Sequence, residues 1–188
     1  MREKTLVIFA SDNGAAVMAP LAELNCGAGL KGRKGQLYEG GIRVPLIVNQ
    51  PGRVPARQID NLVYFPDFMP TLAAIAKFSI LNSQLSTLNS QFSIPKTDGM
   101  DISPLFYGHD IDTDSRPLYW EFPGKQRALR WNGWKAVSVK KGAPLELYRI
   151  KEDPLEQHNL ANDYPALLQQ MDSLMHQLRT PSPTYPCE

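Results

Sequence analysis

The sequence has little of three things that mark common classes of protein. It has two cysteines in 188 residues, Cys26 and Cys187, and neither belongs to a C-x-x-C pair or a Cys/His zinc spacing. Twenty Lys and Arg balance nineteen Asp and Glu, so the net charge of +1 provides no global field for a polyanion. No apolar run approaches the roughly 20 residues of a membrane span. We therefore expect neither nucleic acid nor a membrane as a partner.

The N-terminus resembles a signal peptide only superficially. Charged residues 1–4 precede the apolar run Thr5–Ala10, but this run is shorter than the roughly 7 to 15 residues of a signal core and soon meets Asp12. We interpret Thr5–Ala10 as a buried strand. The localisation stays unknown, and it would be periplasmic or secreted if a missing N-terminus carries an export signal.

The first part of the chain has the pattern of an α/β protein. Thr5–Ala10 is a continuous apolar run without alternation, which is typical of a strand covered on both faces. Val44–Val48, interrupted only by Pro45 near its start, predicts a second strand. A long glycine-rich connection, Gly27–Gly41, lies between them, and a helical pattern begins at Asp67. The sequence predicts part of an α/β domain over residues 1–78.

A near-repeat interrupts this pattern. Leu81–Ser86 recurs seven residues later as Leu88–Ser93, and two copies fall short of the three or four heptads of a coiled coil. We interpret residues 79–97 as a low-complexity insertion that is exposed or poorly ordered.

Residues 98–188 have the pattern of a small α+β subdomain. The Asn132-Gly133 step is a strong hairpin signal, and the apolar residues of 165–179 fall on one helical stripe. We expect this helix to cover an antiparallel sheet. The sheet would contain four short strands at 117–122, 127–131, 134–139 and 145–150.

Asp12-Asn13-Gly14 follows directly on the first predicted strand. Open α/β sheets bind ligands at the carboxyl ends of their strands, and a carboxylate with an amide oxygen suits Ca²⁺ or Mg²⁺. Such triplets usually form turns, so the motif alone is weak evidence for a metal site.

The glycine-rich connection holds a second candidate, Lys34. A P-loop is excluded because no Gly-x-x-x-x-Gly-Lys-Ser/Thr is present. The ammonium of Lys34, beside Gly35, can meet an oxyanion. We interpret Lys31 and Arg33 as a solvated basic loop. For Glu39 and Arg43 we predict an internal ion pair that fixes the loop.

These residues resemble one known family. The strand followed by Ser11-Asp-Asn-Gly14, and then Gly32-x-Lys-Gly-x-x-Tyr-Glu-Gly-Gly-Ile-Arg-Val-Pro45, is similar to the sulfatases of the alkaline phosphatase superfamily. Apart from the repeat, the resemblance covers nearly the whole chain and concerns the family's C-terminal region. It continues through Pro66–Leu72, Asp98–Asp101, Leu118–Phe122, Trp134-Lys135, Leu145–Tyr148, Glu152–Pro154 and Asn159–Ala161.

The resemblance implies a fold and a set of roles. The fold would be α/β, with part of an alkaline-phosphatase-like sheet followed by the α+β subdomain. Asp12 and Asn13 would be metal ligands of an active-site Ca²⁺, with Mg²⁺ as the alternative. Lys34 would contact the sulfate ester as a catalytic and substrate-binding residue. The substrate would be a sulfated small molecule or a sulfated glycan.

The nucleophile of the family is missing. That family uses a formylglycine made from Cys or Ser in a Cys/Ser-x-Pro-x-Arg motif, and neither Cys26 nor Cys187 has this context. The family's other metal carboxylates and active-site histidines lie in an N-terminal region that the chain does not contain. We interpret His109, His158 and His176 as surface residues.

We therefore predict the C-terminal portion of a sulfatase, inactive alone, which needs the missing N-terminal portion as its partner. Two alternatives stay open: a phosphoester or phosphonate-ester hydrolase of the same superfamily, and a non-catalytic module that binds sulfated glycans. Without its neighbours the strand Thr5–Ala10 should expose apolar surface and favour association.

Overall fold

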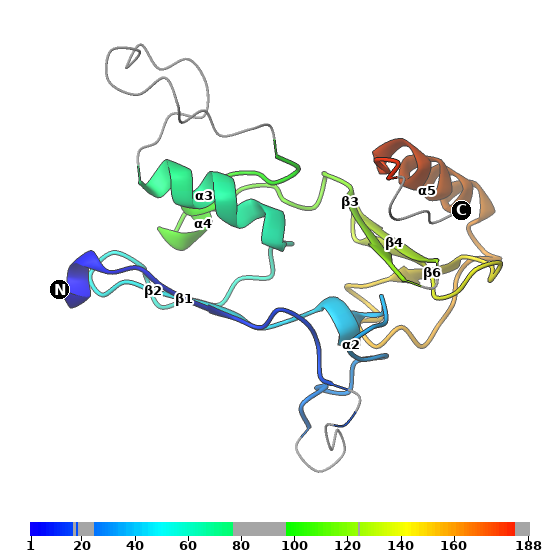
Figure 1. Cartoon of the computed structure of the whole chain (residues 1–188), viewed down its shortest axis with the longest axis horizontal. Coiled ribbons are helices and arrows are strands. Elements are labelled where there is room, and N and C mark those ends of the chain that lie inside the picture. Colours follow the sequence, from blue (N-terminus) through cyan, green and yellow to red (C-terminus); the bar gives the residue numbers. More distant parts are fainter. Residues whose placement is uncertain (17, 19–24, 77–96, 124, 183–188) are drawn as a thin grey trace. The chain divides into compact units, whose positions relative to one another are not determined.

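The computed structural model describes residues 1–16, 18, 25–76, 97–123 and 125–182 (Figure 1). The chain forms two compact units. The first comprises Met1–Ile8 and Val48–Thr113, and the second comprises Phe9–Ile47 and Asp114–Glu188. Strand β1 (Val7–Ala10) pairs with β2 (Leu46–Asn49) in a two-stranded sheet.

The predicted coverage of the first strand on both faces is wrong for this chain. Val7 and Phe9 are 54% and 60% exposed, whereas Ile8 is half-buried. The strand therefore has the alternation of a sheet with one covered face, because only β2 pairs with it and Leu6 and Ile8 pack on one apolar cluster. The apolar exposure expected of a strand with few neighbours is present.

The first unit is built around Ile102, Leu105 and Phe106, all buried. Its elements are η1 (Arg2–Lys4), η2 (Phe65–Asp67), α3 (Phe68–Ile75) and α4 (Ser103–Phe106). The helix predicted from Asp67 is confirmed. The buried carboxylate of Asp67 accepts hydrogen bonds from the backbone amides of Tyr64 and Met100, both at 3.0 Å. These bonds tie the start of α3 to the segment that leads into α4.

The second unit contains a four-stranded antiparallel sheet in the order β3-β4-β5-β6. The predicted strands are confirmed, as is the hairpin, whose turn residues Asn132 and Gly133 have φ of 50° and 79°. The bounds are β3 Leu118–Phe122, β4 Gln126–Trp131, β5 Trp134–Ser138 and β6 Glu146–Arg149.

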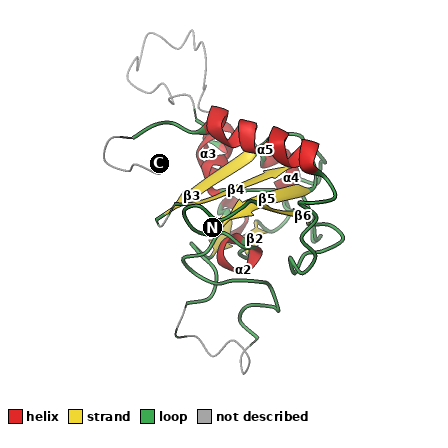
Figure 2. Cartoon of the chain, turned by 90° about the vertical axis from the view of Figure 1, so that its right-hand side faces the viewer, coloured by secondary structure: helices red, strands yellow, loops and turns green. Residues whose placement is uncertain are grey.

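The two faces of this sheet cover different parts of the unit. Helix α5 (Pro165–Leu178) lies across one face (Figure 2), where Met171 and Met175 pack on Leu129, Ala136 and Leu147. The expected cover of the sheet by this helix is confirmed. Residues of the opposite parity, such as Ala128, Val137 and Tyr148, face the other way and pack on Leu37 and Tyr38.

Most of the predicted insertion at 79–97 lies outside the described residues, and the predicted domain limits stay a prediction. In the part of the chain that the structure describes, no helix has the length and apolar character needed to cross a membrane.

Met171→Ala should lower the free energy of unfolding of the second unit by about 2 to 5 kcal/mol, because it removes a buried side chain between α5 and the sheet. Urea unfolding followed by tryptophan fluorescence measures this unit, since all three tryptophans lie in β3, β4 and β5. The exposed Gln170→Ala is the matched control, and equal effects of the two variants would contradict this packing.

Candidate active site

Backbone contacts join the two segments that carry the predicted site residues. The Gly14 amide donates to the carbonyl of Gly41 at 2.9 Å, and the Lys34 amide donates to the carbonyl of Ala15 at 2.9 Å. A Cβ on Gly14 would lie 1.8 Å from the Gly40 oxygen, so only glycine fits this approach. The Asp12–Gly14 turn and the loop that carries Lys34 therefore form one locally fixed element.

The predicted side chains differ in their surroundings. Asp12 and Lys34 are exposed, and Asn13 is half-buried. The Asn13 amide donates from Nδ2 to the Gly14 carbonyl at 3.0 Å, and the Ser11 hydroxyl donates to the Asn13 carbonyl at 2.8 Å. The first bond uses Nδ2, so Oδ1 is the side-chain atom of Asn13 that a metal ion would contact. That the three predicted side chains face one point stays a prediction.

The donor set fits part of a calcium site. A carboxylate and an amide oxygen are the hard ligands that Ca²⁺ prefers, but Ca²⁺ takes six to eight of them. Among the described residues, no group of three or more His, Cys, Asp or Glu side chains could hold a metal ion. Asp12 and Asn13 would therefore supply only part of a coordination shell.

The loop that carries Lys34 is anchored to the sheet by a residue that the sequence did not reveal. Gln126, at the start of β4, is buried; its Nε2 donates to the Gly35 carbonyl at 2.8 Å and its Oε1 accepts from the Leu37 amide at 3.3 Å. One side chain thus fixes the backbone on the C-terminal side of Lys34. No local motif identifies this role, because the partners are 89 and 91 positions away.

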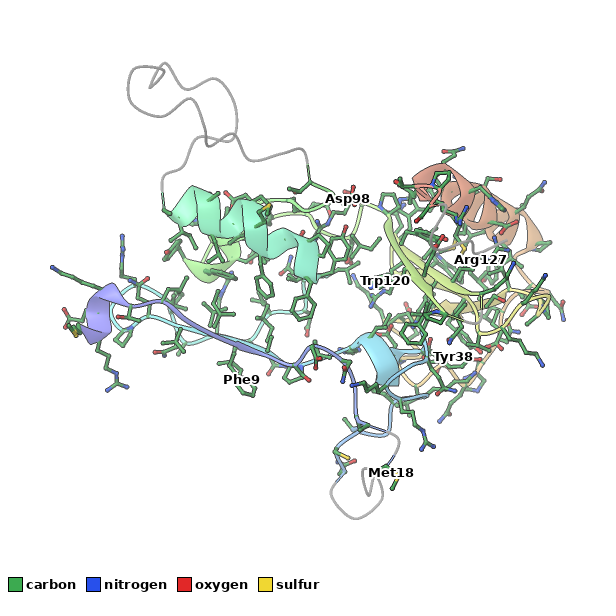
Figure 3. The ribbon with its side chains drawn as sticks, in the orientation of Figure 1. Phe9, Met18, Tyr38, Asp98, Trp120 and Arg127 are labelled. Carbon is green, nitrogen blue, oxygen red and sulfur yellow. The ribbon has the colours of Figure 1, made fainter. Side chains whose placement is uncertain are left out.

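The prediction that Lys31 is solvated is wrong. Its ammonium lies 4.1 Å from the centroid of the Tyr38 ring and 5.0 Å from that of Tyr148, and it pairs with Glu146 at 3.3 Å. Cation–π contacts and the ion pair keep the half-buried ammonium in this place. Figure 3 shows the Tyr38 side chain beside α2 (Glu39–Ile42), in the same unit as Trp120 and Arg127.

The pKa shifts of Tyr38 and Glu146 reflect the contacts within this cluster of Lys31, Tyr38, Glu146 and Tyr148. Burial, and then the hydrogen bond and the negative charge of Glu146, raise the pKa of Tyr38. Burial alone would raise the pKa of Glu146, but hydrogen bonds from Tyr148 and Tyr38 together with Lys31 lower it. Glu146 is thus held ionised between two neutral tyrosines and one lysine.

Glu39 lies at the centre of a second charge cluster. Lys135, fully buried on β5, places Nζ 2.9 Å from Glu39 and 2.9 Å from Glu156. The Glu39 amide donates to Glu156 at 2.7 Å, and Arg130 lies 3.4 Å from Glu39. The predicted pair with Arg43 is present at 3.9 Å, but the Arg43 side chain is 52% exposed. Its contribution is minor beside the buried partners across the sheet.

The pKa values of the two carboxyl groups in this cluster are shifted in opposite directions. Burial would raise the pKa of Glu39, but Lys135 and Arg130 outweigh it and lower the pKa. Burial raises the pKa of Glu156, and Lys135 offsets this only in part. Lys135 thus favours the ionised form of both carboxylates, and for Glu39 this outweighs the effect of burial.

The remaining candidates are at the surface. His109, His158 and His176 are exposed, as predicted, and so is Cys26, a free cysteine. In the described residues, the arrangement offers an exposed ammonium on a braced loop, next to a turn with two oxygen donors. This arrangement can bind an oxyanion and contribute to a cation site.

Comparisons with known proteins point to one family. The Sulfatase family model matches residues 1–78. A sulfatase of Formosa agariphila is 32% identical over 171 residues, which cover 86% of this chain and 28% of that protein. Human arylsulfatase A is 30% identical over an alignment of 201 residues, including gaps. This alignment covers 92% of this chain and 37% of that protein. The chain thus spans about a third of the length of these curated relatives.

Among solved structures, Ps i-CgsB in complex with k-i-k-neocarrahexaose is 30% identical with a TM-score of 0.73. The alignment covers 94% of this chain and 36% of that one. The fold predicted from the sequence is confirmed: α/β of the alkaline-phosphatase-like type, followed by a small antiparallel sheet and a C-terminal helix.

Glu39→Gln should destabilise the chain at neutral pH by about 3 kcal/mol, and Glu156→Gln should cost less, because breaking a buried ion pair leaves its partners uncompensated. The lowered pKa of Glu39 means that its ionisation stabilises the fold above its ordinary pKa, and that this stability is lost as pH falls through the folded-state value. The raised pKa of Glu156 has the opposite sign. Urea unfolding between pH 3 and 8 should show the Glu39→Gln deficit shrink toward acid, and a pH-independent deficit would contradict this account.

Proposed function

Because the chain belongs to the sulfatase family, we propose that it carries one edge of an active site that hydrolyses sulfate esters. The observation that carries the proposal is the backbone link between the Asp12–Gly14 turn and the loop of Lys34. This link brings oxygen donors and an ammonium onto one fixed element. Hydrolysis of a sulfate ester needs positive partners for the sulfate oxygens and for the negative charge that develops as the ester breaks.

Each residue has a role in this proposal. Lys34 contacts the sulfate oxygens and stabilises negative charge that develops as the ester breaks. Asp12 and Asn13 hold Ca²⁺ by their side-chain oxygens, with Mg²⁺ as the alternative. The bound dication would supply charge neutralisation and polarisation of an S–O bond. Gln126 and Glu39 hold the loop and do not touch the substrate.

The nucleophile comes from elsewhere in the enzyme. Ser93 and Ser115 are followed by x-Pro, but Thr97 and Tyr119 stand where the Cys/Ser-x-Pro-x-Arg motif has Arg. No residue of this chain thus fits conversion to formylglycine. The proposal therefore requires an N-terminal portion that supplies the formylglycine and the remaining metal ligands.

The proposed substrate class is a sulfated glycan or a smaller sulfate ester. The support for a glycan is the similarity to Ps i-CgsB, whose structure contains k-i-k-neocarrahexaose.

The test is an aryl sulfate assay with Ca²⁺ on the purified chain, alone and after addition of the upstream segment encoded by its source DNA. The chain alone should be inactive, and the complemented enzyme should be active. Lys34→Ala should lower the turnover of the complemented enzyme by about a hundredfold, the typical effect of removing one charge-stabilising donor. Lys151→Ala, an exposed lysine outside the proposed site, is the matched control. Turnover by the chain alone that is lost in Lys34→Ala would overturn the proposal, as would a preference for phosphate or phosphonate esters.

Calorimetry tests the metal half of the proposal. Ca²⁺ should bind the chain weakly, because two protein oxygens leave most of the shell to water. Asp12→Ala should abolish this binding, and the exposed Asp163→Ala should not. Tight binding that survives Asp12→Ala would show that the metal ligands lie elsewhere.

A further inference from the structure

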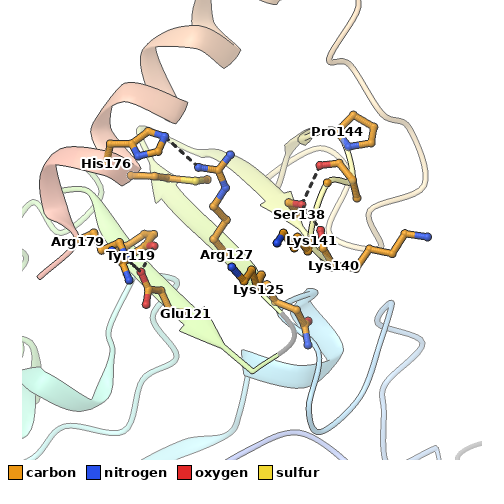
Figure 4. A pocket seen from close by; sticks show the side chains of 14 residues that line it. Tyr119, Glu121, Lys125, Arg127, Ser138, Lys140, Lys141, Pro144, His176 and Arg179 are labelled. Atoms are coloured by element: carbon orange, nitrogen blue, oxygen red, sulfur yellow. Dashed lines mark hydrogen bonds and ion pairs between the residues drawn. The ribbon is translucent and has the colours of Figure 1, made fainter. Parts of the chain in front are cut away.

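The second unit has a basic groove on the α5 face of its sheet (Figure 4). Its volume is about 430 Å³, within the usual range of ligand pockets. Five of the residues that line it are Lys or Arg and one is Glu, although the whole chain has a net charge of only +1. The five cations are Lys125, Arg127, Lys140, Lys141 and Arg179.

The two arginines are fixed in advance. Arg127 pairs with Asp172 at 2.9 Å, and Arg179 pairs with Glu121 at 2.7 Å. The Tyr119 hydroxyl also donates to Glu121, which holds this carboxylate in place. Arginines that are already oriented lose less side-chain freedom when a ligand binds. Two carboxylates against five cations leave an excess of three positive charges.

The excess charge comes from the lysines. Lys140 and Lys141 lie on the exposed loop between β5 and β6, whose shape is fixed by the Ser138 hydroxyl at 3.2 Å from the Lys140 carbonyl and 3.1 Å from that of Ala143. Within the described residues, no ion pair joins these lysines or Lys125 to a carboxylate. Uncompensated like charges around one groove are unfavourable for folding, and a bound anion removes this cost.

The groove does not include Lys34 among its lining residues. Arg127 and Glu121 have the strand parity of Leu129, which faces α5, whereas Leu37 and Tyr38 of the Lys34 loop pack on the opposite face of the same sheet. A ligand in this groove therefore meets a different set of cations from an ester at Lys34.

We propose that this groove binds a sulfated segment of a glycan away from the ester that is cleaved. The choice of a glycan rests on the proposed function, whereas the choice of an anion rests on the groove itself. Sites for single-stranded nucleic acid pair basic grooves with several stacking aromatics. The described lining holds Tyr119 but no Trp or Phe. Sulfate groups spaced along a sugar chain match separate lysine and arginine cations without base stacking.

The probe is heparin, a sulfated glycan, titrated into the purified 188-residue chain at several salt concentrations. Lys140→Ala/Lys141→Ala should weaken the affinity for heparin about tenfold. The slope of log K against log salt concentration should become shallower, because about two fewer counterions are released on binding. The control Lys4→Ala/Lys151→Ala removes the same charge from exposed lysines outside the groove and should have little effect. Circular dichroism and tryptophan fluorescence verify that both double variants keep the fold.

Two further arms separate this site from the proposed active site. Lys34→Ala should leave heparin affinity unchanged, and Lys140→Ala/Lys141→Ala should leave aryl sulfate turnover of the complemented enzyme unchanged. Desulfated heparin, which keeps its carboxylates, should bind more weakly. Equal weakening by the two double variants, or equal affinity for desulfated heparin, would overturn the proposal. Tighter binding of a single-stranded DNA of matched charge would overturn it in favour of nucleic acid.

Discussion

The loop that carries Lys34 depends on one buried ammonium, Lys135 of β5, which lies 2.9 Å from both Glu39 and Glu156. All three side chains are nearly or fully removed from solvent, so each charge must be compensated inside the protein. Glu39 opens α2, and the next two glycines form the backbone contacts with Gly14 and the Lys31 carbonyl. The place of the Asp12–Gly14 turn and of Lys34 therefore follows from an ion pair that touches neither of them.

Alternate residues of each strand point to opposite faces of the sheet, and the two faces contact different parts of the chain. On one face, the loop that carries Lys34 and the adjoining α2 contact Lys135, Tyr148 and Gln126. On the other face, Leu129 and Arg127 meet α5 and the basic groove. A single sheet with a two-residue repeat thus places the two proposed anion sites on opposite faces, and the two sites share no cations.

The sequence predicted what is decided locally and missed what is decided at a distance. The Asn132-Gly133 hairpin and the apolar stripe of α5 depend on neighbouring residues, and both are confirmed. Glu39 and Lys135 are 96 positions apart, so no spacing reveals their contact, and only the weaker Arg43 partner lies within one helical turn. Lys31 appeared solvated for the same reason, because Glu146 and Tyr148 meet it from β6. The family pattern supplied Asp12, Asn13 and Lys34, and their convergence stays a prediction.

The most direct test of this account is amide hydrogen exchange in Lys135→Met, which keeps the side-chain length and leaves two buried carboxylates without their lysine. Peptides that cover residues 31–42 should lose protection by at least about tenfold, whereas α5 and β4 should keep theirs, because the apolar contacts of α5 with the sheet remain. An unchanged exchange rate in residues 31–42 would show that the loop of Lys34 does not depend on the buried ion pair, and would contradict the central claim.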